Sequence, residues 1–342
     1  MKLTLKNTLV FILFCTFLTS YGQNKATEMY KVLKEDMKTK ELIIVLMEEN
    51  DKVLDKLEKK TDELEYYKTV IKEYNSLIKE LSPRYLNFFK GIQYKKVSEL
   101  ASISTEDRRN YYYLCYNIAQ LQLEGKTIPF DVFNEVETNK EHEFLEPYKE
   151  MVLKKSFPWA KLEIYSYSEK KSSKIASSKS FINVNLPSVM PTKWGMVYAL
   201  SNFQSMYDDE VTLTANSFKG KVLLLCSEDL DKKISANEIK KYYTNEYEVV
   251  SRDVYAKAIE LKNPKYIYAI TVPYMMSPTN SNSSGMTISS LMYSNSLIDC
   301  STGRLVGLAV ASFGVGPIGV ANKEIDKGSL KQINNQLSKI VN

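Results

Sequence analysis

The sequence predicts an α+β protein of more than one domain, in which a helical, coiled-coil-like N-terminal domain precedes a mixed-sheet α/β domain. Residues 26–82 contain no Gly or Pro and are rich in helix formers. Beyond residue 221, short apolar runs alternate with capped amphipathic segments, which is typical of helices packed on a mixed sheet. The predicted division is a signal peptide (1–23), a helical domain (24–155), a Ser/Lys-rich linker or edge hairpin (156–192) and an α/β domain (193–342).

The N-terminus has the pattern of a cleavable signal peptide. Lys2 and Lys6 precede an apolar run over residues 9–18, and a small-x-small cleavage site follows at residues 20–22. The run is shorter than the roughly 20 residues that span a bilayer as a helix. We expect an exported protein, periplasmic, outer-envelope associated or secreted, with no transmembrane helix in the mature chain.

Composition and charge narrow the classes of partner. Hydrophobic residues make up 44% of the chain and charged residues 25%, as in a globular protein with a sizeable core. Removing Lys2 and Lys6 lowers the net charge from +5 to +3. This charge is too small to indicate nucleic acid or an anionic membrane as a partner.

Three cysteines remain after cleavage: Cys115, Cys226 and Cys300. An odd number is not a disulfide framework. Cys226 and Cys300 both lie near predicted strand ends, so they are the one pair that we expect to be able to form a disulfide.

Residues 26–82 are expected to form one long helix, ended by Pro83. Its apolar positions recur in alternating four- and three-residue steps, the spacing of coiled coils and helical bundles. Asn50 and Lys60 are the two breaks in this seam. The seam otherwise consists of Leu46, Val53, Leu57, Leu64, Tyr67, Ile71, Tyr74, Ile78 and Leu81. It either packs on two further helices, predicted after Ser104 and around residues 129–155, or pairs with another chain.

The middle of the chain carries weaker signals. Residues 166–180 contain seven serines and four lysines and predict an exposed loop or hairpin tip. A short edge strand is expected at residues 182–185, where apolar residues alternate with asparagines. Residues 194–207 are apolar and fit either a helix or a strand.

The second half predicts the order β-α-β-α-β-β-β-α. Residues 222–226 form a continuous apolar run, as in a strand buried on both faces. Ser235 and Glu238 form a capping box, and Ser251 is expected to cap the next helix. A hairpin is expected around residues 299–303, with Gly303 in the left-handed conformation.

These segments resemble an α/β module of bacterial envelope proteins. The succession VLLLC, YEVVSRDVY, KYIYAITV and SLIDCSTGRLVG is similar to modules in the curli secretion channel and in the amino-terminal domain of the Tol-system propeller protein. The matching residues are Val249, Val250, Arg252, Asp299, Thr302 and Gly303. The resemblance covers residues 221–313; it implies an assembly or scaffold role in the cell envelope and carries over no catalytic residue.

The residue types needed for catalysis are sparse. The single histidine, His142, lies in a charged helical stretch far in sequence from Cys226. The G-x-G-x-x-G match at residues 314–319 is interrupted by Pro317, and no strand follows it, which argues against a dinucleotide site. We predict no catalytic residue, no metal site and no cofactor.

One edge of the second sheet collects polar residues. Cys226, Glu228, Asp229 and Ser251 follow strand ends, where α/β folds place ligands, and form a candidate ligand edge. The hypothesis is a non-enzymatic envelope scaffold or protein-binding protein that associates, with a partner or with itself, through the helical half. The alternative is a small-molecule binding module at this carboxyl edge.

Overall fold

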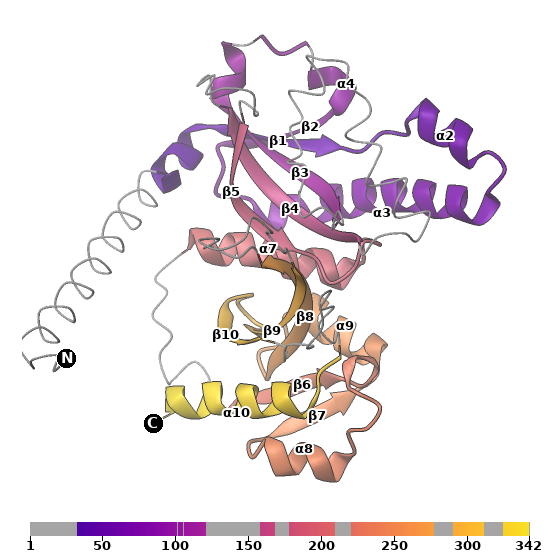
Figure 1. Cartoon of the computed structure of the whole chain (residues 1–342). Coiled ribbons are helices and arrows are strands. Elements are labelled where there is room, and N and C mark those ends of the chain that lie inside the picture. The colour runs from indigo at the N-terminus through magenta and orange to yellow at the C-terminus, as the bar shows by residue number, and fades with distance from the viewer. Residues whose placement is uncertain are drawn as a thin grey trace, which may run out of the picture.

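Figure 1 shows the computed structural model, which describes residues 33–100, 102–104, 106–120, 158–167, 178–208, 220–276, 290–310 and 324–341. These residues form two mixed five-stranded sheets, with a helix between them. The predicted signal peptide, the predicted helix at residues 129–155, His142 and the glycine-rich turn at residues 314–319 lie outside the described residues.

The first sheet has the strand order β2-β1-β3-β4-β5. Its strands are β1 (Glu41–Leu46), β2 (Gly91–Lys96), β3 (Tyr111–Gln120), β4 (Pro158–Tyr167) and β5 (Ser178–Asn185). Strands β2 and β3 flank β1 in parallel, and β4 and β5 add in antiparallel fashion. Helices α2 (Asp51–Leu57) and α3 (Thr61–Tyr85) connect β1 to β2, and the short α4 (Val97–Leu100) follows β2 directly.

The second sheet has the strand order β10-β9-β8-β6-β7. Its strands are β6 (Val222–Cys226), β7 (Tyr247–Val250), β8 (Tyr266–Met276), β9 (Ser290–Asp299) and β10 (Leu305–Val310). Helix α8 (Ala236–Tyr242) precedes β7, α9 (Arg252–Glu260) follows it, and α10 (Lys327–Val341) ends the chain. The predicted order β-α-β-α-β-β-β-α is confirmed, as is the capping box of Ser235 and Glu238.

The two sheets share one topology. In each, the first strand lies next to the edge, the second and third strands flank it in parallel, and the fourth and fifth extend the sheet in antiparallel fashion. The helices also correspond: α3 and α7 (Lys193–Tyr207) cover the same face of the first sheet, as α8 and α10 do in the second. Helices α4 and α9, which follow the second strands, cover the opposite faces.

The predicted helical N-terminal domain is wrong, because this half of the chain contains a sheet. Residues 42–46 lie in β1 and are almost completely buried, between α3 on one face and α4 on the other. An all-apolar run is the pattern of a parallel strand covered on both sides. The tyrosine-rich segment at residues 111–116, expected to be helical, is part of β3, in keeping with the β propensity of aromatic residues.

The predicted seam is an internal core and not the stripe of one long helix. Leu46 ends β1, and Asn50 lies in the following loop, where its carbonyl accepts hydrogen bonds from the first turn of α2. Lys60 is the N-cap of α3. The two polar breaks are therefore helix boundaries. The remaining seam residues pack inside the chain: Val53 and Leu57 from α2, and Leu64, Tyr67, Ile71, Tyr74, Ile78 and Leu81 from α3.

Helix α7 connects the two sheets (Figure 1). Side chains on every side of it are buried, and the helix contacts α3 of the first half and α9 of the second. A helix that is apolar all round needs cover on all sides. Its cover here comes from both sheets, so a single cluster of buried side chains runs from β1 to β8. The segment at residues 194–207, which fitted helix or strand, is thus helical, and the structure has the edge-hairpin form for β4 and β5.

The β9–β10 turn packs directly on α7. Gly303 has a φ of +75°, as the turn required. A Cβ atom at this position would overlap the Cβ of Ser201 on α7 and lie 3.0 Å from its carbonyl carbon. The absence of a side chain at Gly303 therefore serves both the turn and the close approach of the second sheet to α7.

We expect Gly303→Ala to lower the free energy of unfolding by about 2–5 kcal/mol, because left-handed strain and overpacking against Ser201 add together. Gly220→Ala is the matched control, since Gly220 has a φ of +77° but nothing within 4 Å of the added Cβ, so only the strain of about 1–2 kcal/mol applies. Urea unfolding of both variants measures the difference. Equal losses would show that the contact with Ser201 contributes nothing.

Candidate functional site

The candidate ligand edge lies at the carboxyl end of β6. The strand ends at Cys226, and a turn of 3₁₀ helix at Ser227–Asp229 follows. The side chains of Glu228 and Asp229 reach from this turn to Arg252 at the start of α9, next to the exposed Ser251. The structure therefore brings Cys226, Glu228 and Asp229 together and places Arg252 beside them.

Glu228 is bonded by three donors of its own chain. Cys226 donates its thiol hydrogen to Oε2 over 3.0 Å, the Ser227 hydroxyl donates to the same oxygen over 2.7 Å, and the backbone N–H of Arg252 donates to Oε1 over 3.0 Å. These bonds lower the pKa of Glu228 to about 2. The first-turn amide of α9 is thus capped by Glu228, while the Ser251 side chain makes no cap hydrogen bond.

The thiol of Cys226 is poorly suited to nucleophilic chemistry. Burial, and then its hydrogen bond to Glu228, raise its pKa to about 12. The thiolate, which is the reactive form, is therefore almost absent at neutral pH. Asp229 forms a bidentate ion pair with Arg252, whose guanidinium also lies over the rings of Trp194 and Tyr255 at 5.4 and 5.6 Å.

The first sheet has the same arrangement at its carboxyl edge. Glu48, two residues beyond the end of β1, accepts hydrogen bonds of 2.9 Å from both the backbone N–H and the hydroxyl of Ser98 in α4. In both sheets, a carboxylate that follows the first strand caps the helix that follows the second strand. At the place where open α/β sheets bind ligands, the carboxylates of both sheets thus bond to the chain itself.

The candidate disulfide between Cys226 and Cys300 is not formed. Both cysteines are free and buried. Cys226 lies at the carboxyl end of β6, whereas Cys300 follows β9, and its backbone N–H donates to the carbonyl of Tyr266 at the start of β8. Because β6 runs parallel and β9 antiparallel to β8, the carboxyl ends of β6 and β9 lie at opposite ends of the strands, and so do Cys226 and Cys300.

A buried polar cluster on the first sheet was not foreseen. Glu163 on β4 accepts hydrogen bonds from Lys161 at 2.8 Å and Tyr165 at 2.6 Å, and from the amide of Asn117 on β3. A two-residue alternation along β4 puts the lysine, glutamate and tyrosine on one face, which the sequence shows once the strand is known. A carboxylate so buried is stable only with such partners.

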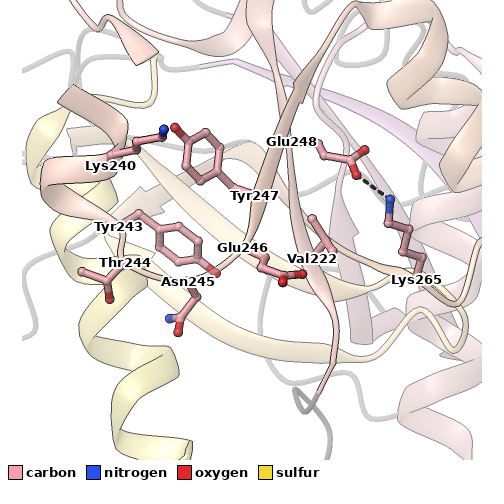
Figure 2. A pocket seen from close by; sticks show the side chains of 9 residues that line it. All are labelled: Val222, Lys240, Tyr243, Thr244, Asn245, Glu246, Tyr247, Glu248 and Lys265. Carbon is pink, nitrogen blue, oxygen red and sulfur yellow. Dashed lines mark hydrogen bonds and ion pairs between the residues drawn. The ribbon is translucent and has the colours of Figure 1, made fainter. Parts of the chain in front are cut away.

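A second unforeseen feature is an open hollow at the amino end of β7 (Figure 2). It has a volume of about 740 Å³ and is bordered by α8, the α8–β7 loop and the starts of β6 and β8. Its lining residues are Val222, Lys240, Tyr243, Thr244, Asn245, Glu246, Tyr247, Glu248 and Lys265. The tyrosines between charged residues at 240–248 are a weak sequence signal, because sequence alone does not show that β7 is an edge strand.

Charge within the hollow is partly paired. Glu248 accepts hydrogen bonds from Lys265 and from the hydroxyl of Tyr266, the latter at 2.8 Å, and these bonds lower its pKa (Figure 2). The rings of Tyr243 and Tyr247 meet edge to face, with 6.2 Å between centroids. The hollow thus offers aromatic surface and backbone beside a neutralised ion pair.

The residues of the hairpin motif have a structural role. Asp299 accepts hydrogen bonds from the backbone N–H groups of Ser301 and Thr302 and from the Ser301 hydroxyl, and it pairs with Lys221. Burial alone would raise the pKa of Asp299, but the bonds from Lys221, Ser301 and Thr302 outweigh it and the pKa is lowered.

Among the described residues, no group of three or more His, Cys, Asp or Glu side chains could hold a metal ion. No helix in the described ranges is both long and apolar enough to cross a membrane. Comparisons with family models, with curated proteins and with solved structures found no match to the chain.

We expect the thiol of Cys226 to resist alkylation in the folded protein. With a pKa of about 12, its thiolate fraction near pH 8 is about 10⁻⁴, so iodoacetamide should react at least a hundredfold more slowly, roughly, than with urea-unfolded protein. Ser227→Cys, which places a thiol at the exposed next position, is the control and should react quickly. Peptide mass spectrometry gives the rate at each site. Rapid labelling of Cys226 would show that it is a reactive thiol.

We expect Asp299→Asn to reduce the free energy of unfolding by about 2 kcal/mol near pH 7, because Lys221 loses its charged partner. The folded pKa of Asp299 is depressed, so its contribution is complete above its unfolded pKa of about 3.9 and is lost as pH falls through the lower folded value. The gap between the variant and the native sequence should therefore narrow toward about pH 2.

Urea unfolding across this pH range measures the gap for Asp299→Asn, with the exposed Asp253→Asn as control. A gap that stays constant with pH would mean that the ion pair does not stabilise the turn.

Proposed function

We propose that this chain is an exported, non-enzymatic scaffold or protein-binding protein of the cell envelope. Export is supported by the signal-peptide pattern of residues 1–23, and the envelope by the resemblance carried by Val249, Val250, Arg252, Asp299, Thr302 and Gly303. The observation that carries the non-enzymatic part is the closure of both carboxyl edges by the chain's own carboxylates, Glu48 and Glu228.

This closure argues against the small-molecule alternative. A ligand at the carboxyl edge of the second sheet would have to displace the three donors on Glu228, or separate Asp229 from Arg252. Each displaced charge-assisted bond costs about 1.5–3 kcal/mol before the ligand gains anything. A second sheet with the same closure indicates that capping is the regular use of these carboxylates.

The surface of association is not the predicted seam. Its apolar residues are buried against the sheets, so a partner helix could reach them only by unfolding the first half. Deleting residues 26–82 would remove β1, an inner strand that pairs with both β2 and β3, and is therefore not a clean test of association. The scaffold proposal rests instead on the packing of both halves against α7, which leaves the outer edges of the two sheets to face partners.

The proposal is tested by cross-linking the protein in its native cell envelope, purifying it and identifying co-purified proteins by mass spectrometry. We expect a stoichiometric protein partner, recovered equally with Glu228→Gln and Cys226→Ser, because these side chains serve the fold and not the partner.

An enzyme would behave differently in the same assay. Turnover of any hydrolysable substrate that is lost in Cys226→Ser, Glu228→Gln or Asp229→Asn would contradict the non-enzymatic proposal. The same variants thus distinguish a scaffold, which keeps its partner, from a catalyst, which loses its reaction. Their melting temperatures, measured alongside, show that each variant is folded.

A further inference from the structure

Strand β7 is an edge of the second sheet with free backbone groups. It is the last strand in the order and pairs on one side with β6. The backbone N–H of Leu223 donates to the carbonyl of Glu246 over 3.0 Å, and alternate residues of a strand bond to the same side. The backbone groups of Glu246 and Glu248 therefore point toward β6. Those of Tyr247 and Val249 point outward, without a backbone partner among the described residues.

The side chains along this edge are accessible. Val249 is 40% exposed, and Tyr247 is half-buried beside the hollow (Figure 2). The hollow is open, whereas small-molecule pockets bury most of the ligand surface. Its position along an edge strand suits the side chains of an extended chain segment laid beside β7.

The protein surface next to the hollow is positively charged. Lys241 of α8 and Lys331 of α10 both lie over the ring of Tyr242, at 5.5 and 5.0 Å from its centroid. Lys240 is exposed at the rim of the hollow. Within the described part of the chain, none of these three lysines has a carboxylate partner.

The nearby carboxylates are already engaged. Glu248 is paired with Lys265 and bonded to Tyr266, and Glu238 is paired with Lys327. Glu246 is the one exposed carboxylate that lines the hollow. The surface beside the hollow therefore carries an excess of positive charge, which favours an anionic partner over a cationic one.

We propose that the free edge of β7 binds an extended, acidic segment of a partner protein, which adds to the second sheet as a further strand. Main-chain hydrogen bonds to Tyr247 and Val249 supply affinity, the hollow receives alternate side chains, and Lys240, Lys241 and Lys331 select for acidic residues. This inference rests on the proposed protein-binding function and assigns its site.

A second copy of the chain fits this edge less well. Two β7 strands paired about a twofold axis normal to the sheet would place both sets of α8 and α10 helices on one face of the joined sheet. The unpaired lysines of the two copies would then lie on that same face and repel each other. An acidic segment neutralises this charge.

The test uses the full chain and two fluorescent synthetic peptides of about six residues, the usual strand length. Both peptides alternate Val or Thr with a charged residue, which is Glu in one and Lys in the other. Fluorescence anisotropy should show saturable binding of the Glu peptide that weakens with added salt. The Lys peptide should bind about tenfold more weakly or worse. Equal binding of the two peptides would overturn the charge selection.

Val249→Pro should weaken binding of the Glu peptide by about tenfold, because it removes an outward N–H without breaking the bonds to β6. Val249→Thr keeps the N–H and should bind within about twofold of the native chain. In the native chain, the backbone N–H of Val249 should also become protected from hydrogen exchange when the peptide binds, a readout that needs no variant. Unchanged binding by Val249→Pro, or no protection, would overturn strand addition.

The charge is tested with Lys240→Gln, Lys241→Gln and Lys331→Gln combined, which should weaken the Glu peptide about tenfold and flatten its salt dependence. Lys232→Gln with Lys233→Gln, exposed lysines that precede the other end of α8, is the charge control and should bind within about twofold. A partner that still co-purifies with Val249→Pro would keep the scaffold proposal and overturn this site. Absence of any partner, with peptide binding intact, would overturn the scaffold proposal and keep this site.

Discussion

The fold depends on the burial of α7 between two sheets. Met196, Leu200 and Phe203 are almost completely buried, and so is most of the rest of the helix. Each such side chain contributes about 1.5–3 kcal/mol when removed from water, so the helix stabilises the molecule only while both sheets cover it. By topology α7 is the last helix of the first half, yet it also covers the α9 side of the second. A boundary at residue 193 would separate it from the sheet to which it belongs by topology.

The second half was readable from its sequence because its elements are short and clearly bounded. Ser235 and Glu238 mark a helix start, and the turn at Gly303 has its expected conformation. The first half misled because one strand, β1, and two helices, α2 and α3, contribute the apolar residues of the predicted seam to one core. Residues 42–46 carry the same buried-strand pattern as residues 222–226, but they stand next to strongly helical segments, so the helical spacing continued through them.

The position of the candidate site could be predicted from the sequence, but the bonding and the pKa values of its residues could not. Cys226, Glu228 and Asp229 follow one strand end, so their proximity is a local property. That Arg252 pairs with Asp229 and that burial raises the pKa of Cys226 depends on how α9 returns to β6, which is a long-range property. The position of β7 at an edge is also long-range, because strand order is set by which strands pair and not by the residues of β7 alone.

Because the carboxyl edges are capped, the backbone groups that remain available for hydrogen bonding are those along the end strands of each sheet. Helices cover both faces of each sheet, and Glu48 and Glu228 close the loops beyond the first strands. The main-chain groups that still lack partners in such an arrangement are those of end strands. A long apolar end strand would invite indiscriminate pairing, and proteins limit this with short edges and with lysines nearby. Strand β7 has four residues, with lysines and an open hollow beside it, and is too short to bind a partner strand through backbone hydrogen bonds alone. Its side chains and charge must therefore supply the selectivity, which is the condition for recognising one partner.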